Sequence, residues 1–235
     1  MGEEHATSNP MRIYEQLAQD ILLLRIKPGE VISESQLCER FEVSRTPIRG
    51  VLQRLAQADL VDIVPRKGTR VTRIDYRIVD QMIYQRMAVE GMVLRDYIRS
   101  SGPLDAEIVR KSLTDLTANY DTGMKDGNFD PERFRDQDLQ MHEIWFQKMH
   151  RELLWDNIRK TQSSYSRFCM LDMLETQNYE HVIREHGLLL QVIEEKNEAA
   201  IEALLSRHLY GGVRRLGTRV FQDFRDFFIP ESINV

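Results

Sequence analysis

Hydrophobic residues near the start of the chain recur at helical spacing, and later ones form short runs rich in β-branched residues. The first helical stripe consists of Ile13, Leu17, Ile21 and Leu24. It predicts a helix over residues 11–25, which the turn Lys27-Pro28-Gly29 ends. The later runs, Leu60–Val64 and Gly68–Arg73, flank a turn at Pro65 and predict a two-stranded hairpin.

Two short helices joined by a tight turn are predicted between these elements. The first covers residues 33–41, and the spacing of Ser33 and Gln36 fits a capping box at its start. The second covers residues 45–57, with Ser44 as a favourable N-cap. This layout is typical of a helix-turn-helix, which places its second helix in the DNA major groove. With the hairpin as a wing, the pattern predicts a winged helix-turn-helix.

From residue 76 onward the pattern indicates long helices only. Six are predicted, over residues 76–100, 105–125, 131–148, 152–172, 179–196 and 197–226. The expected fold is therefore mainly α, an N-terminal winged helix-turn-helix followed by an all-α antiparallel six-helix bundle. The expected organisation is a flexible tail at 1–10, a DNA-binding domain at 11–74, a helical domain at 75–228 and a C-terminal tail at 229–235.

Composition is that of an ordinary globular protein. Of 235 residues, 42% are apolar and 29% are charged, and no apolar run approaches the roughly 20 residues that span a bilayer. The start of the chain carries Glu3 and Glu4 without basic residues, unlike a secretory signal. Cys38 and Cys169 lie far apart and imply no disulfide framework, so a cytoplasmic location is expected.

The net charge of −5 is distributed unevenly. Residues 11–75 hold 11 Lys or Arg and 9 Asp or Glu, whereas residues 76–235 hold 21 and 26. Charges more than about 8–10 Å apart are largely screened at physiological salt. The overall negative charge therefore neither supports nor excludes DNA binding.

Polar residues interrupt the apolar faces of three predicted helices in the second half. They are Asp138, His142, His186 and His208. Burying such groups without a partner is costly, and a single inward histidine is more often a hydrogen-bonded core residue. Four inward ligands together favour a divalent transition metal. One oxygen and three nitrogens suit Zn²⁺, the leading candidate, as well as Ni²⁺, Mn²⁺ or Fe²⁺. The remaining histidines, which do not share these faces, are His5, His150 and His181.

Several segments together resemble the GntR family of bacterial transcription regulators, in particular its FadR-like branch. The first half carries LCERFEVSRTPIRGVLQRLAQADLV at 37–61 and PRKGTRV at 65–71. The second half carries Arg86 and Glu90, the Asp138/His142 pair, Glu185-His186 and His208. Six rather than seven helices in the second domain make the VanR subgroup the more similar one.

The resemblance implies that the helix over 45–57 reads an operator. Arg45 and Arg49 are four residues apart and share one helix face, and arginine can donate two hydrogen bonds to guanine. The implied DNA contacts are Ser44, Arg45, Thr46, Arg49, Arg66, Lys67, Gly68 and Thr69, with Arg70 beside them. Two positions depart from the family: Ser35 replaces a DNA-contacting arginine, and Gly50 replaces a glutamate. In the alternative interpretation, the winged helix binds only protein and its arginines are solvated.

In the second domain the resemblance implies that the Asp/His₃ set binds metal and that an open coordination position takes the carboxylate of a small organic or sugar acid. Arg86 is the implied second anchor, because arginine binds carboxylates bidentately. Its simpler role is an i,i+4 ion pair with Glu90, worth about half a kcal/mol. Further candidates for contacting the effector are Arg135, Tyr165 and Arg167. Arg151 departs from the small residue of the family and changes the end wall of the pocket.

We therefore expect a homodimeric transcriptional regulator, most often a repressor in this family, that binds a palindromic operator in double-stranded DNA under effector control. Two alternatives remain open. The metal could activate water in a hydrolase fused to a DNA-binding head, with Glu90 and Glu185 as the available carboxylates. Or the metal could be purely structural, with no small-molecule control.

Overall fold

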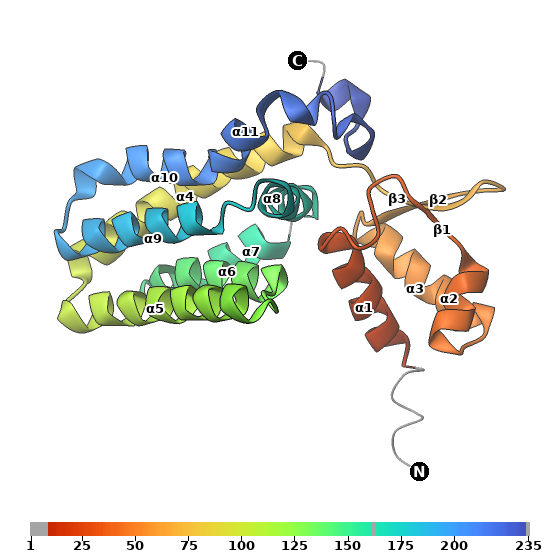
Figure 1. Cartoon of the computed structure of the whole chain (residues 1–235), viewed down its shortest axis with the longest axis horizontal. Coiled ribbons are helices and arrows are strands. Elements are labelled where there is room, and N and C mark those ends of the chain that lie inside the picture. The colour runs from red at the N-terminus through yellow and green to blue at the C-terminus, as the bar shows by residue number, and fades with distance from the viewer. Residues whose placement is uncertain (1–8, 161–162, 234–235) are drawn as a thin grey trace, which may run out of the picture. The chain divides into compact units, whose positions relative to one another are not determined.

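Figure 1 shows the computed structural model of the chain, which describes residues 9–160 and 163–233. The described residues divide into two compact units. The first joins the chain up to Ile78 with Ser163–Met170 and the segment from Thr218 onward, and the second contains the remainder. The expected mainly helical chain with an N-terminal winged helix-turn-helix is confirmed.

The first unit contains the winged helix-turn-helix. Its elements are α1 (Pro10–Leu22), β1 (Val31–Ile32), α2 (Glu34–Phe41), α3 (Arg45–Gln57), β2 (Val61–Val64) and β3 (Gly68–Val71). The three strands form an antiparallel sheet with β3 in the middle. β1 was not predicted, because a two-residue strand is too short to show an alternating pattern. Ser33 caps α2 as expected, whereas Ser44 makes no side-chain hydrogen bond at the start of α3.

Packing between α1 and α3 fixes which face of α3 is presented to solvent. The two facing stripes consist of Ile13, Leu17 and Ile21 on α1 and Ile48, Val51, Leu52 and Leu55 on α3. All are at most 1% exposed. Arg45 and Arg49 lie on the opposite, exposed face of α3, as a base-reading helix requires.

The helical part of the chain contains more breaks than expected. Its α-helices are α4 (Tyr76–Ser100), α5 (Pro103–Asp126), α6 (Pro131–Lys148), α7 (Glu152–Lys160), α8 (Ser163–Thr176), α9 (Tyr179–Glu194), α10 (Ile201–Leu209) and α11 (Gly211–Leu216). The predicted helix over 152–172 corresponds to α7 and α8, and that over 197–226 to α10, α11 and short 3₁₀ turns. Glycines at 211, 212 and 217 weaken helix propensity in the second case.

A large apolar core holds the bundle together. It includes Leu94, Tyr97, Met141, Trp145, Phe146, Leu189, Ile193, Ile201 and Leu205, which come from α4, α6, α9 and α10. α5 packs on α6 and on α9, and α9 packs on α10. No helix in the described part of the chain is both long and apolar enough to cross a bilayer.

The segment that joins the winged helix to α4 is held by the C-terminal part of the chain. Ile74 donates to the carbonyl of Phe227 (2.8 Å) and accepts from the amide of Ile229 (2.9 Å). The ring of Tyr76 makes edge contacts with Phe168 of α8 and with Phe228. This C-terminal part of the chain was expected to belong to the helical domain at 75–228 and to a tail at 229–235. The structure groups it with the first unit, because its apolar side chains are buried there.

Candidate metal centre and nucleic-acid interface

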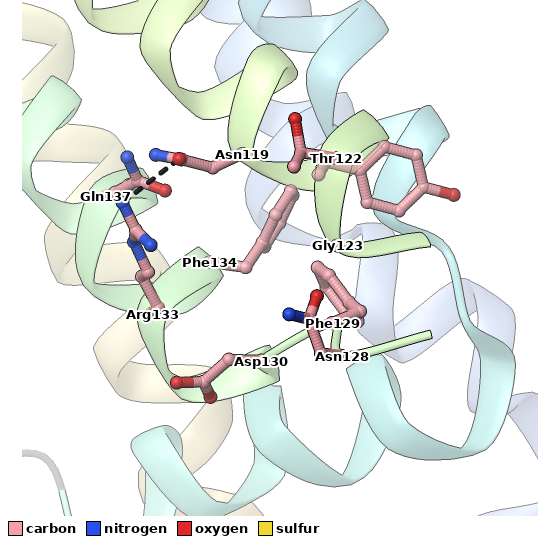
Figure 2. A pocket seen from close by; sticks show the side chains of 10 residues that line it. Asn119, Thr122, Gly123, Asn128, Phe129, Asp130, Arg133, Phe134 and Gln137 are labelled. Carbon is pink, nitrogen blue, oxygen red and sulfur yellow. Dashed lines mark hydrogen bonds between the residues drawn. The ribbon is translucent and has the colours of Figure 1, made fainter. Parts of the chain in front are cut away.

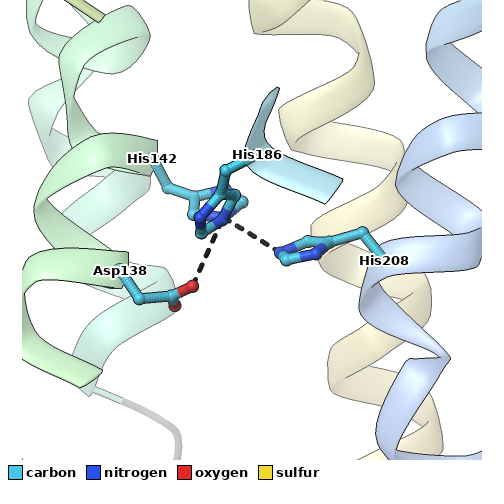
Figure 3. Close-up of side chains that lie close together, drawn as sticks. All are labelled: Asp138, His142, His186 and His208. Carbon is cyan, nitrogen blue, oxygen red and sulfur yellow. Dashed lines mark hydrogen bonds and ion pairs between the residues drawn. The ribbon is translucent and has the colours of Figure 1, made fainter. Parts of the chain in front are cut away.

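Four side chains from three helices of the bundle converge on one point. Asp138 and His142 come from α6, His186 from α9 and His208 from α10 (Figure 3). Asp138 is 9% exposed, and His142 and His186 are fully buried. One ligand atom from each of the four lies within 4.8 Å of the others. The structure thus brings together all four residues that the sequence nominated as metal ligands.

The separations of the ligand atoms suit a small divalent cation. His142 Nε2 lies 3.2 Å from Nε2 of both His186 and His208, and His186 Nε2 lies 3.2 Å from Asp138 Oδ1. In a tetrahedral site with metal–ligand bonds of about 2.0 Å, neighbouring ligand atoms are about 3.3 Å apart. These three separations match that value, while the full set spreads up to 4.8 Å, which is wider than a closed tetrahedron. The donor set therefore suits zinc or a similar ion that also accepts a further ligand.

Two buried carboxylates orient the histidines from behind. Glu185 Oε2 lies 3.0 Å from His208 Nδ1, and Glu90 Oε1 lies 3.3 Å from His142 Nδ1. In the tautomer whose Nδ1 proton faces the carboxylate, the Nε2 atoms of His142 and His208 present their lone pairs to the centre. Without a cation these lone pairs would face one another at hydrogen-bond distance. The arrangement therefore favours a bound cation over a self-contained hydrogen-bond network.

The protonation states agree with metal ligation. Burial, together with the nearby His208 and His142, lowers the pKa of His186 well below its ordinary value, so the imidazole is neutral and can coordinate. Burial is the largest single influence and would raise the pKa of Glu90, but the charges of Arg86 and His142, together with their hydrogen bonds, outweigh it and bring the pKa to about 2. Glu90 is thus a carboxylate at every physiological pH.

Arg86 forms a buried ion pair with Glu90. Its Nη2 lies 2.8 Å from Glu90 Oε1, and the two side chains are 5% and 0% exposed. Arg86 also lies 5.9 Å from the ring centroid of Trp155, which stacks on His142. The pair belongs to the layer behind His142, and the effector contact implied for Arg86 remains a prediction.

The other expected effector contacts are distributed over both units. Arg135 lies on α6, one turn before Asp138. Tyr165 and Arg167 are buried in the part of α8 that groups with the winged helix. Arg167 donates to the carbonyl of Thr72 (2.6 Å), and burial lowers its pKa to about 10. The effector contacts implied for Tyr165 and Arg167 remain predictions.

From the sequence, Glu90 was expected to pair with Arg86, and Glu90 and Glu185 were the available bases for a hydrolase; neither was expected to support a histidine ligand. In the structure both are engaged: Glu90 with Arg86 and His142, and Glu185 with His208 and with His181 (3.1 Å). Two features of the sequence could have indicated that Glu185 contacts histidines: His181 lies four residues before it, and His186 follows it directly. His181 itself is half-exposed and lies outside the ligand set, as predicted.

A separate small pocket of about 150 Å³ lies where α5 meets the start of α6, and none of the four candidate ligands lines it (Figure 2). Tyr120, Phe129 and Phe134 form its aromatic side. On its polar side, Arg133 donates to Asn119 Oδ1 (3.0 Å). Gly123 permits the close approach of the chain here, since a Cβ at this position would lie 2.9 Å from Phe129 Cα.

The exposed start of α3 and the tip of the wing form the candidate nucleic-acid interface. Its exposed members are Ser44, Arg45, Thr46, Arg49, Arg66, Lys67, Gly68 and Arg70. Thr69 was predicted to contact DNA but is only 4% exposed. Residues alternate between the two faces of β3, so Thr69 points to the core while Gly68 and Arg70 point outward.

Two details bear on how this surface meets DNA. Arg49 Nε lies 3.1 Å from Glu34 Oε2, in a pair whose arginine is 62% exposed, so the contact is weak and easily exchanged for a base. A Cβ added at Gly50 would meet no atom within 4 Å. Gly50 is therefore not required for packing inside the protein.

Comparisons with known proteins agree with this architecture. Residues 10–71 match the model of the bacterial regulatory proteins of the gntR family, and residues 81–211 match the FCD domain. The HTH-type transcriptional repressor RspR of Escherichia coli (strain K12) is 25% identical over 220 residues, covering 94% of this chain and 93% of that protein. The gluconate operon transcriptional repressor of Bacillus subtilis (strain 168) is 23% identical, covering 82% and 78%.

Solved structures show the same fold. Escherichia coli McbR/YncC aligns with a TM-score of 0.65 at 17% identity, covering 92% of this chain and 98% of that one. A GntR transcriptional regulator from Rhodococcus sp. RHA1 aligns with a TM-score of 0.68 at 18% identity, covering 88% and 97%. The predicted fold, a winged helix-turn-helix followed by helices, is thus confirmed, and the VanR subgroup remains a prediction.

Proposed function

Since the chain belongs to the GntR family of bacterial regulatory proteins and carries an FCD domain, we propose that it is a repressor whose operator binding is controlled by a small organic or sugar acid at the metal centre. The convergence of Asp138 and three histidine Nε2 atoms within 4.8 Å carries this proposal. Four protein ligands leave room for a fifth or sixth ligand, and a carboxylate oxygen suits that position. Zinc is the leading metal.

DNA binding is assigned to a homodimer. Two copies of α3 would enter successive major grooves, which requires a short palindromic operator. For the acid to control binding, it must have different affinities for the DNA-bound and released states. α8 contributes to both units, because its residues up to Met170 group with the winged helix and the remainder with the bundle.

Metal-dependent release of operator DNA tests the proposal. An operator is first selected in vitro from random DNA, and a panel of small organic acids and sugar acids is then added to the complex. The panel includes gluconate, because one relative is named for a gluconate operon. We expect at least one acid to weaken DNA binding and to raise the melting temperature of the metal-loaded protein, with no effect after chelation.

Two results would contradict this proposal. If chelation unfolds the bundle and no acid shifts the melting temperature, the metal is structural. If the loaded protein hydrolyses esters or amides from the same panel, it is an enzyme.

Arg49→Ala tests the base-reading role of α3. We expect operator binding to weaken by about 1–3 kcal/mol and the selected sequence to lose its preference at one base pair in each half-site. Lys67→Ala is the matched control, because a lost phosphate contact weakens binding uniformly and lowers the salt dependence without changing the preferred sequence. An unchanged binding profile for Arg49→Ala would remove this residue from the interface.

A further inference from the structure

Arg135 is a mostly buried cation whose donors are incompletely used. Its side chain is 18% exposed, and its Nη2 lies 3.4 Å from Asp136 Oδ1, a long contact with a neighbour that is itself 53% exposed. Its Nε and Nη1 atoms are buried and have no hydrogen-bond partner among the described residues. Buried guanidinium donors without acceptors are unfavourable, so an acceptor from outside the chain would stabilise this side chain.

The position of Arg135 connects it to the metal centre. It precedes Asp138 by three residues and His142 by seven on α6, so the three side chains lie along one stripe of the helix. Nearby indole groups show the same excess of donors. Trp145 and Trp155 both contact the His142 ring, and the Nε1 atoms of both are buried without an acceptor in the described part of the chain.

Charges around the centre leave an excess of positive charge. Arg86 neutralises Glu90, and Arg207 (3.4 Å) accompanies Glu185. A divalent metal with Asp138 as its one anionic ligand keeps one positive charge. Arg135 offers a second place for an anion, because Asp136 contacts only its Nη2 and leaves the buried Nε and Nη1 donors without an acceptor among the described residues. The local environment therefore suits a ligand with two negative charges and several acceptor atoms.

We propose that the effector is a dianionic organic acid, with one carboxylate at the metal and a second anionic group at Arg135. The inference rests on the proposed function and specifies its ligand class. It also changes the role of Arg86. Because Arg86 is already paired with Glu90, it is a positioning residue that acts on His142 through that carboxylate.

A pair of matched acids tests the proposal in the metal-loaded full chain. Malate and 2-hydroxybutyrate share the same 2-hydroxy-acid end and differ by one terminal carboxylate. The same comparison is made between succinate and butyrate and between glutarate and pentanoate. Binding is followed by melting temperature and by tryptophan fluorescence, since the chain has 2 tryptophans and both lie beside His142. Metal content is measured after each titration to exclude stripping of the ion.

We expect at least one dicarboxylate to bind about tenfold or more tightly than its monocarboxylate partner. Arg135→Gln should abolish this preference while leaving metal content, helix content and monocarboxylate binding unchanged. Arg135→Lys, which keeps the charge but loses the guanidinium geometry, should keep part of the preference.

Different failures have different meanings. Equal binding of both acid classes by the unmodified protein, or a preference that survives in Arg135→Gln, overturns the assignment of Arg135 and the dianionic class but leaves the proposed function intact. If no acid of either class binds the metal-loaded protein, the proposed function fails together with this inference.

Discussion

Replacing His208 with alanine is expected to remove bound metal and the response to acids, while DNA binding by the winged helix persists. His208 contributes the only candidate ligand from α10, and its Nε2 lies 3.2 Å from that of His142. Because losing an outer partner of a ligand already costs about 10–100-fold in metal affinity, losing a ligand should cost about 100-fold or more. A metal at 100 times its dissociation constant stabilises a fold by about 2.7 kcal/mol, and most of that increment should disappear.

Elemental analysis and thermal melting with and without metal measure this effect. His181→Ala is the matched control, because His181 also contacts Glu185 (3.1 Å) but is half-exposed and outside the ligand set. It should retain metal. Full metal occupancy in His208→Ala would remove His208 from the ligand set, and equal metal loss in both variants would indicate that Glu185, rather than either histidine, controls the site.

The convergence of Asp138, His142, His186 and His208 could be predicted from sequence because helical spacing alone determines which face of a helix carries each side chain. Each residue follows the apolar stripe of its own helix, and the stripes of a bundle must face one another. The sequence therefore determines that these groups point inward. It does not determine the 3.2 Å separations of their ligand atoms, which depend on how α6, α9 and α10 pack.

The layer behind the ligands could not be predicted in the same way. Glu90 and His142 lie on α4 and α6, more than fifty residues apart, and nothing in their local spacing pairs them. The unpaired donors of Arg135 could not be predicted for the same reason. Whether they find an acceptor depends on which side chains the neighbouring helices bring close, and the described residues bring none to Nε and Nη1. Thr69 was mispredicted for a different reason. The motif shows that Thr69 lies in the wing, but the alternation of side chains along β3 decides that its side chain points to the core rather than toward DNA.

Long-range pairing also explains why the C-terminal segment groups with the first unit. The C-terminal segment was expected to be a tail, yet Ile74 exchanges backbone hydrogen bonds with Phe227 and Ile229. Phe228 and Ile233 are buried in the same unit. A short irregular segment has no periodicity, so its partner about 150 residues earlier leaves no local signal.

Arg86→Met is expected to lower the stability of the metal-free protein by about 3–5 kcal/mol, because it leaves Glu90 as a buried carboxylate without its cation. Arg86→Met/Glu90→Leu should recover much of this stability, since replacing both charges of a buried pair is often neutral. Even with its stability recovered, the double variant should bind metal about 10–100-fold more weakly than the unmodified protein, because His142 loses the carboxylate next to its Nδ1.

Urea denaturation with and without metal distinguishes the two roles of Arg86. A positioning residue changes stability in the absence of any acid, whereas an effector anchor changes only acid binding. A single variant as stable as the unmodified protein, with acid binding alone abolished, would make Arg86 the anchor. In that case Arg86 would bind the acid and Arg135 would not, which is the reverse of what their contacts indicate: Arg86 is paired with Glu90, whereas Arg135 has buried donors without an acceptor among the described residues.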